Sequence, residues 1–233
     1  MSEASLSQVL EACTQRCREM DAPLGDRLQS FADDVRRLDP VFAEVVDRMV
    51  AHLLRVEAGA GAPNIGEPFP SFVLPDENGH LVSLEGLLRS GPAVIAFHRG
   101  HWCPYCRINA ETLARIEPEL KRAGAHLVII TPETQHFTRE LKADAKATFP
   151  ILTDLDCGYA LDLGVAFKVP EEKRAAMTSA GFDISGFNDN SNWTLPIPAT
   201  FVVGDDGLVK ARYVDPDYRH RMDIQEILRA ARS

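Results

Sequence analysis

Residues 97–106 read Phe-His-Arg-Gly-His-Trp-Cys-Pro-Tyr-Cys, and they join an apolar run, residues 93–97, to an amphipathic pattern over residues 103–123. This succession predicts a strand, a short turn and a helix, with Cys103 at the helix N-terminus. Unpaired backbone N–H groups and the positive end of the helix dipole favour an anion at that position. Pro104 suits the first helical turn because its missing N–H costs nothing there.

Cys106 follows Cys103 by one helical turn. Cys-x-x-Cys thiols at helix starts have pKa values well below the ordinary value of about 8.5. The pair therefore predicts a redox site in which Cys103 is a reactive thiolate and Cys106 can attack a sulfur that Cys103 holds. This interpretation requires that solvent reach the two sulfurs and that they lie within bonding distance.

The chain has 233 residues, of which 45% are hydrophobic and 25% charged, and a net charge of −9. Such a composition is ordinary for a soluble globular protein, and the acidic balance argues against a nucleic-acid partner. No apolar run is long enough for a membrane span, and the N-terminus lacks the pattern of a signal peptide. We therefore expect a cytoplasmic protein without a membrane partner, in which a Cys-x-x-Cys is catalytic or metal-binding rather than structural.

Two units are expected along the chain. Apolar spacing predicts an N-terminal helical segment over residues 1–58, and the Gly- and Ala-rich stretch 57–66 is typical of a linker. From residue 63 to 233, apolar strands alternate with helices and end in a hairpin and a closing helix, which predicts an α/β fold with a mixed central sheet between helices. A polar excursion over about residues 168–195 interrupts this order, and its stretch 187–193 could form a lid, since a long polar loop inside a compact domain is either functional or mobile.

The other three cysteines have simpler interpretations. Cys13 and Cys17 share the apolar stripe of the first expected helix, so we interpret them as small buried hydrophobes, with an auxiliary thiol pair as the alternative. Cys157 is expected to be a plain cysteine, with a remote resolving role as the alternative.

The second unit resembles the thioredoxin superfamily and, over residues 63–230, the peroxiredoxin-like branch of the alkyl hydroperoxide reductase/thiol-specific antioxidant (AhpC/TSA) family. The resemblance implies a thioredoxin-like three-layer sandwich. It rests on five stretches, which are residues 65–72, 78–79, 99–106, 197–203 and 214–219.

By this resemblance Cys103 attacks and Cys106 resolves, while Pro198 matches the superfamily's cis-proline, which faces the dithiol. The sequence departs from the typical peroxiredoxin where that family has a Thr or Ser, a Pro and a late Arg, since these positions hold Gly100, Ala96 and Pro198. These departures favour exchange chemistry over peroxide reduction.

The acid that thioredoxin buries on the strand before its dithiol is also missing here, because that strand is wholly apolar. Water, His98 or His101 would then have to carry protons to and from the site. Either histidine could equally be a polar surface residue.

Three functions remain open. The first is a thiol peroxidase, in which Arg99 and Arg107 could lower the pKa of Cys103 and orient the peroxide, and Trp102 could recognise substrate. A solvated surface charge is the alternative for each arginine and the favoured one for Arg107, and Trp102 could instead cover the first helical turn. The second is a thiol–disulfide oxidoreductase that uses the same two cysteines. The third is a zinc module, with Cys103, Cys106 and one or both of His98 and His101 as ligands.

The two redox functions need no cofactor. Their partners would be a small peroxide or disulfide and a thioredoxin- or glutathione-type reductant. The N-terminal helices could cover the core, form a homodimer or bind a partner.

Overall fold

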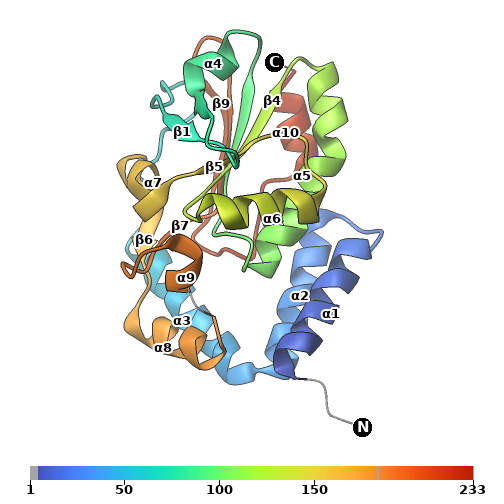
Figure 1. Ribbon diagram of the computed structural model, residues 1–233, viewed down its shortest axis with the longest axis vertical. Helices are drawn as coiled ribbons and strands as arrows, with labels where there is room; N and C mark the ends of the chain where they lie inside the picture. The colour runs from blue at the N-terminus through green and yellow to red at the C-terminus, as the bar shows by residue number, and fades with distance from the viewer. Residues whose placement is uncertain (1–4, 183, 233) are drawn as a thin grey trace.

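The computed structural model describes residues 5–182 and 184–232 and is built on a five-stranded sheet of order β5-β4-β3-β8-β9 (Figure 1). Strands β3, β4 and β5 run parallel, whereas β8 is antiparallel to β3 and β9 to β8. The mixed central sheet expected from the sequence is confirmed. The strands are β3 (Ala93–Phe97), β4 (His126–Thr131), β5 (Ile151–Thr153), β8 (Ala199–Val203) and β9 (Val209–Val214).

Helices cover both faces of this sheet, because successive side chains of a strand point to opposite sides. In β3, Val94 and Ala96 pack into the core beneath α5, α6 and α10, whereas Ile95 and Phe97 pack into the core beneath α4 and α7. A small β1–β2 hairpin lies beside the second core. The elements are α4 (Leu84–Leu88), α5 (Pro104–Arg122), α6 (Gln135–Ala145), α7 (Gly158–Asp162), α10 (Ile224–Ala230), β1 (Val73–Pro75) and β2 (Leu81–Ser83), with a short 3-10 turn, η1 (Leu155–Cys157), before α7.

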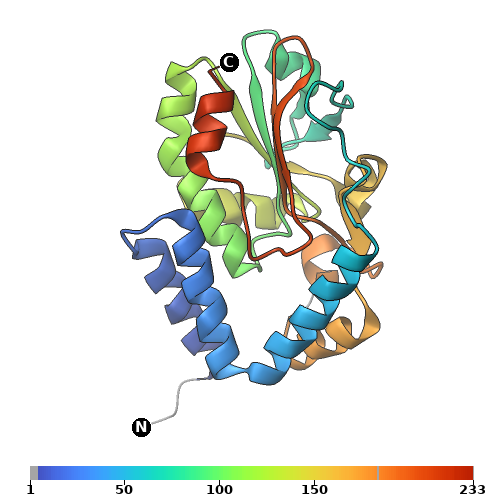
Figure 2. The ribbon, with the colours of Figure 1, turned by 180° about the vertical axis from the view of Figure 1, so that it is seen from behind.

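The N-terminal segment forms three helices, α1 (Leu6–Glu19), α2 (Leu24–Leu38) and α3 (Pro40–Arg55). A capping box at Ser5 begins α1, and the Asp39 side chain accepts from the Phe42 N–H at the start of α3. Helices α1 and α2 stand against one side of the fold, and α3 crosses to the other side, next to α8 (Glu171–Ser179) (Figures 1 and 2). Their apolar faces share one core with Cys103 and Cys106.

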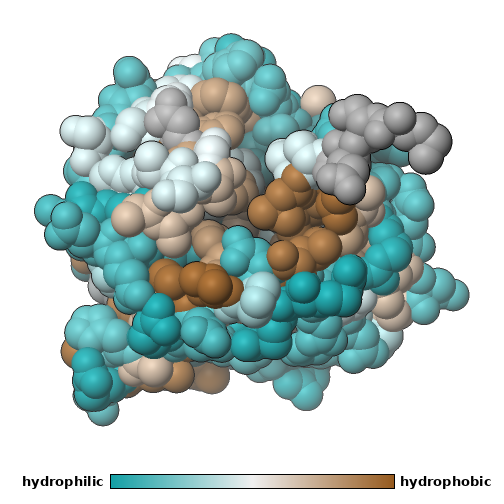
Figure 3. All heavy atoms as spheres, turned by 90° about the horizontal axis from the view of Figure 1, so that it is seen from below, coloured by the Kyte–Doolittle hydropathy of each residue, from teal (hydrophilic) through white to brown (hydrophobic). Residues whose placement is uncertain are grey.

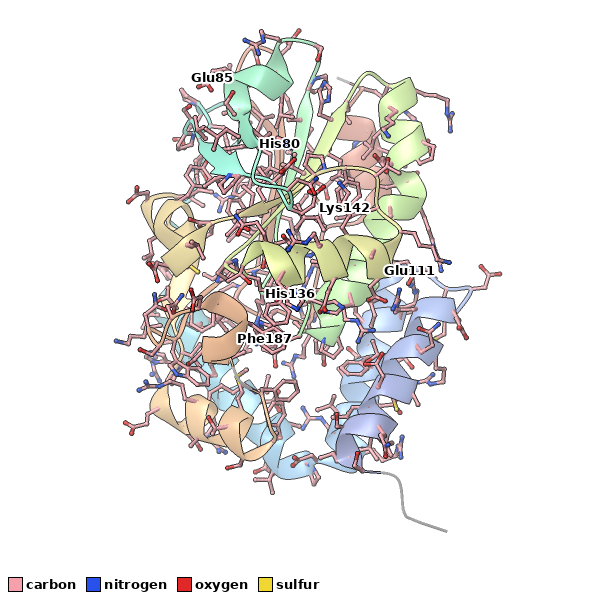
Figure 4. The ribbon with its side chains drawn as sticks, in the orientation of Figure 1. His80, Glu85, Glu111, His136, Lys142 and Phe187 are labelled. Atoms are coloured by element: carbon pink, nitrogen blue, oxygen red, sulfur yellow. The ribbon has the colours of Figure 1, made fainter. Side chains whose placement is uncertain are left out.

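Ion pairs fasten α1 to α5 and α6. Arg18 donates to Glu111 at 2.6 Å and to Asp144 at 2.8 Å, and Arg107 donates to Glu11 at 2.6 Å and to Asp144 at 2.8 Å. Glu111 lies where α5 faces α1 (Figure 4). We call these five residues the α1–α5–α6 network. The sequence left open that Arg107 acts on Cys103, but the Arg107 guanidinium is bound to the carboxylates of this network.

The excursion expected as a long polar loop is instead mostly regular structure. It folds because Val169, Met177, Ile184 and Leu195 bury one another in a small core of their own. Phe187 packs against Phe137 of α6, with ring centroids 4.4 Å apart, on the side seen in Figure 4. The elements are β6 (Ala166–Lys168), α8 (Glu171–Ser179), α9 (Ile184–Asn188) and β7 (Thr194–Pro196). Across the described residues, none of the helices has the length and hydropathy that a membrane span requires.

Candidate functional site

The predicted strand, turn and helix around the two cysteines are confirmed. β3 ends at Phe97, Cys103 is the N-cap of α5, and Pro104 is its first residue. The Cys103 carbonyl accepts from the Cys106 N–H at 3.0 Å, which closes the first turn. The turn needs glycine at Gly100, whose φ of +133° is rarely open to other residues and where a Cβ atom would lie 2.5 Å from the Glu133 carboxyl group.

The two sulfurs are not open to bulk solvent, so that expectation is wrong. Cys103 is 1% exposed and Cys106 is 0% exposed, because the N-terminal helices pack over the start of α5. Cys103 instead lines a cavity of about 270 Å³ enclosed by α1, α2, α3, α5, α8 and the segment 217–220, which we call the Cys103 cavity. From the end of the molecule where these helices meet, apolar side chains are seen to gather around a hollow (Figure 3).

The negative charge of the pair belongs on Cys106 rather than on Cys103. The Cys106 Sγ accepts from the Arg99 backbone N–H at 3.3 Å and from the Arg221 guanidinium at 3.4 Å. Burial opposes ionisation of Cys106, but a hydrogen bond from the Cys103 thiol and the positive charges of Arg221 and Arg99 lower its pKa well below the ordinary value. Burial and the same hydrogen bond raise the pKa of Cys103, so the predicted Cys103 thiolate is corrected to a thiol at rest.

Neither histidine is placed to carry protons as the sequence suggested. His98 is fully buried, which lowers its pKa to about 4, and its Nε2 atom contacts the Asn109 amide at 2.9 Å. The His101 ring faces α6, with its nitrogens 3.5 Å from Glu140 and 3.6 Å from Asp144. His98 is therefore neutral and internal, and His101 points towards α6.

A buried acid does lie beside the turn before Cys103, but it follows another strand. Glu133 follows β4, and its carboxylate accepts from the His101 backbone N–H at 2.7 Å. Burial raises the pKa of Glu133 to about 8, and the charge of Cys106 acts in the same direction. The sequence held one signal for it: a polar residue just after a buried parallel strand lies at the same sheet edge as the turn after β3.

Arg99 and Trp102, predicted as supporting residues, both line the Cys103 cavity. The Arg99 guanidinium carbon lies 3.8 Å from the centre of the Tyr218 ring and 4.7 Å from that of Trp102. Such stacking on two aromatic faces stabilises a buried cation. Tyr218 and Arg221 come from the segment after β9, more than a hundred residues away, and sequence spacing gave no indication of either.

Pro198 is buried immediately before β8, where Ala199 pairs with Phe97 at the end of β3. The cis bond implied by the resemblance is absent, since every described peptide bond is trans. Trans is the lower-energy isomer by roughly 0.5–1 kcal/mol, and the Ile197 N–H is already satisfied by the Val165 carbonyl at 2.7 Å. Pro198 thus keeps its predicted place beside the site end of β3 but not the predicted bond.

The other three cysteines, Cys13, Cys17 and Cys157, are free and form no disulfide. Cys17 is buried and Cys13 half-buried in the core of the N-terminal helices. Cys157 donates to the Thr194 carbonyl at 3.4 Å, and burial raises its pKa. In residues 5–182 and 184–232, no three side chains of the kinds that bind metal come together as a candidate site.

Comparison with known proteins gives consistent matches. A family model described as the AhpC/TSA family matches residues 65–212. Prostamide/prostaglandin F synthase of Salmo salar is 36% identical over 67 residues, which are 29% of this chain and 34% of that protein, so the chain spans about a third of this curated relative.

Two solved structures have a similar fold. Peroxidoxin BcpB from Mycobacterium tuberculosis has a TM-score of 0.57 at 20% identity and covers 73% of this chain and 97% of its own. A mutant of peroxiredoxin 6 of Arenicola marina has a TM-score of 0.55 at 20% identity and covers 72% of this chain and 71% of its own. The predicted thioredoxin-like fold is confirmed.

Proposed function

Because the chain belongs to the AhpC/TSA family, we propose that it is a thiol-dependent peroxidase that cycles between the Cys103–Cys106 dithiol and its disulfide. One observation carries this proposal: a sulfur that opens on a cavity, Cys103, is backed by a second sulfur whose negative charge the fold stabilises. Its substrates are hydrogen peroxide or organic hydroperoxides. A thioredoxin- or glutathione-type dithiol or thiol restores the reduced state, and the reaction takes place in the cytoplasm.

The oxidising step starts with a proton shift between the sulfurs. Cys103 passes its proton to Cys106 along their hydrogen bond, and the Cys103 thiolate attacks the distal oxygen of ROOH. An S–O bond forms, the O–O bond breaks, and the alkoxide takes the proton from the Cys106 thiol to leave as ROH, which makes Cys106 a thiolate again. Cys103 is then a sulfenic acid.

The resolving step uses the neighbour one turn away. Cys106, again as thiolate, attacks the Cys103 sulfur, and hydroxide leaves and is protonated to water. We assign the proton for the departing hydroxide to Glu133, which holds a proton at neutral pH because its pKa is about 8. The sum is the Cys103 thiol, the Cys106 thiolate, one proton from Glu133 and ROOH giving the disulfide, ROH and water.

A thiol–disulfide oxidoreductase is the second candidate, because one structural feature favours it. Gly100 occupies the position at which the family has a hydroxyl residue, and its backbone leaves no room for a side chain beside Glu133. In this function Cys103 attacks a disulfide sulfur, one thiolate leaves, and Cys106 then releases the second by resolving the mixed disulfide.

Rapid mixing separates the two functions. The reduced protein is mixed with hydrogen peroxide, with an organic hydroperoxide or with a small disulfide, and loss of free thiol is followed. A peroxidase oxidises its dithiol far faster than free cysteine reacts with the same peroxide. Oxidation of Cys103 at the rate of free cysteine, together with rapid reduction of the disulfide, would replace the first candidate by the second.

A further inference from the structure

Two buried basic side chains that line the Cys103 cavity have donor atoms without partners among the described residues. Lys173 on α8 is 1% exposed, and its Nζ atom has no hydrogen-bond partner among the described residues and lies 3.4 Å from the centre of the Phe42 ring. Arg99 is 2% exposed, and its Nε and Nη1 atoms also lack partners in the described part of the chain. A buried N–H without an acceptor is costly, so these groups indicate a ligand that supplies acceptors.

The acidic residues of the lining do not fill that role. Asp217 accepts two hydrogen bonds from Arg219, at 2.8 and 2.7 Å. Asp39 is engaged by the N–H of Phe42 at the start of α3, at 2.9 Å. Asp33, at the exposed side of the lining, accepts from the Gln29 side chain at 2.8 Å. Each carboxylate of the lining thus has a hydrogen-bond partner, whereas the Lys173 Nζ atom and two nitrogens of Arg99 have none among the described residues.

The rest of the lining is largely apolar. It comes from the N-terminal helices and from the excursion, and it includes Leu10, Phe31, Val46, Met177 and Phe182. The volume of about 270 Å³ lies near the lower end of the range for small-molecule sites, roughly 300–1,000 Å³. An inorganic anion would leave this apolar wall unused, and a neutral apolar molecule would leave the cations unpaired.

We propose that the Cys103 cavity binds an amphipathic carboxylate, with Lys173 and Arg99 holding the carboxylate and the apolar wall holding the chain. Resting on the proposed function, this makes the substrate a medium-chain hydroperoxide that bears a carboxylate and presents its O–O bond to Cys103. The N-terminal helices and the excursion then serve to build a substrate chamber over the dithiol.

The charge of the cavity fits a monoanion. Arg99 is charged at neutral pH, while burial, reinforced by Arg99, lowers the pKa of Lys173 to about 6. Of the other groups that act on Lys173, Asp39 favours its charged form, Arg219 opposes it, and Cys103 favours it only as a thiolate. Lys173 is therefore mostly neutral in the empty cavity and takes up a proton when a carboxylate arrives.

Binding can be measured without turnover. Decanoate and decanol are titrated into the reduced protein in a calorimeter, with the wild type, Lys173→Met and the exposed control Lys168→Met. We expect decanoate to bind at least about tenfold more tightly than decanol to the wild type and the control, since hydrogen bonds to charged groups are worth this much. In Lys173→Met the preference should fall several-fold, because Arg99 alone then holds the carboxylate. Proton uptake, read from two buffers with different ionisation enthalpies, should disappear in this variant.

Equal binding of decanoate and decanol by the wild type, or an undiminished preference in Lys173→Met, overturns the inference. A thermal melt of Lys173→Met verifies that the variant is folded. Turnover is a separate measurement, with a ten-carbon hydroperoxy acid and its methyl ester. If neither is reduced while the Lys173-dependent preference for decanoate stands, the peroxidase proposal fails and the carboxylate site survives. If both are reduced equally and decanoate shows no preference, only the carboxylate site fails.

Discussion

The α1–α5–α6 network and the Cys103 cavity both place charged side chains between the N-terminal helices and the thioredoxin-like unit, yet they differ in one respect. In the network, Arg18 and Arg107 each meet two carboxylates within 2.8 Å. In the cavity, the buried Lys173 and Arg99 have donor atoms without acceptors among the described residues. Paired charges link the two parts of the chain, whereas basic side chains with unpartnered donor atoms mark the place where we propose that a ligand binds.

The largest effect is expected when the sulfur that lines the Cys103 cavity is removed. Cys103→Ser should abolish both peroxide and disulfide turnover, because the group that opens on the cavity is lost. Cys106→Ser should instead oxidise once and accumulate a Cys103 sulfenic acid, detectable by mass spectrometry with a dimedone-type probe. Cys157→Ser, a buried cysteine away from the pair, is the control and should keep full activity. A trapped sulfenic acid on Cys106 in Cys103→Ser would reverse the assigned order of attack.

Lys173→Met tests the idea that the cavity is built at a cost to stability. We expect a gain of a few kcal/mol in the free energy of unfolding near neutral pH, because a buried amine without partners is removed. In the unfolded chain the Lys173 side chain binds a proton below pH 10.5, whereas in the folded protein it does so only below about pH 6. The wild type therefore becomes more stable as pH rises between these values, and the gain shrinks. Urea melts over this pH range measure it, and a loss of stability in the variant would contradict the comparison.

Arg18→Met tests the other half of the comparison, the paired charges of the α1–α5–α6 network. The Arg18 side chain is 9% exposed and donates to Glu111, Asp144 and the Asp144 carbonyl. Its removal should lower the free energy of unfolding by about 2 kcal/mol, since partly buried carboxylates lose their partner. The control is Arg16→Met, whose side chain is 49% exposed and should cost about 0–1 kcal/mol. Equal denaturant midpoints for the two variants would mean that the network does not fasten α1.

Glu133→Gln gives the smallest expected effect. The amide keeps an acceptor for the His101 N–H but has no acidic proton, so the rate of dithiol oxidation should fall about tenfold at neutral pH. In the wild type the rate should decline as pH passes about 8, where Glu133 loses its proton. The variant should lack this decline. A decline near that pH in both proteins would assign it to another group.

The sequence by itself determined the strand, turn and helix around Cys103, the mixed sheet and the three N-terminal helices, because these follow from local periodicity and from proline and glycine chemistry. It could not place Glu133, Tyr218, Lys173 or Arg221 at the dithiol, since each arrives from a separate element through packing.

Only the tertiary structure decided that the sulfurs are covered, that the negative charge belongs on Cys106 and that Arg99 is buried between aromatic rings. The physical reason is that burial and hydrogen bonds from distant residues determine which sulfur ionises, and the spacing of two cysteines contains neither.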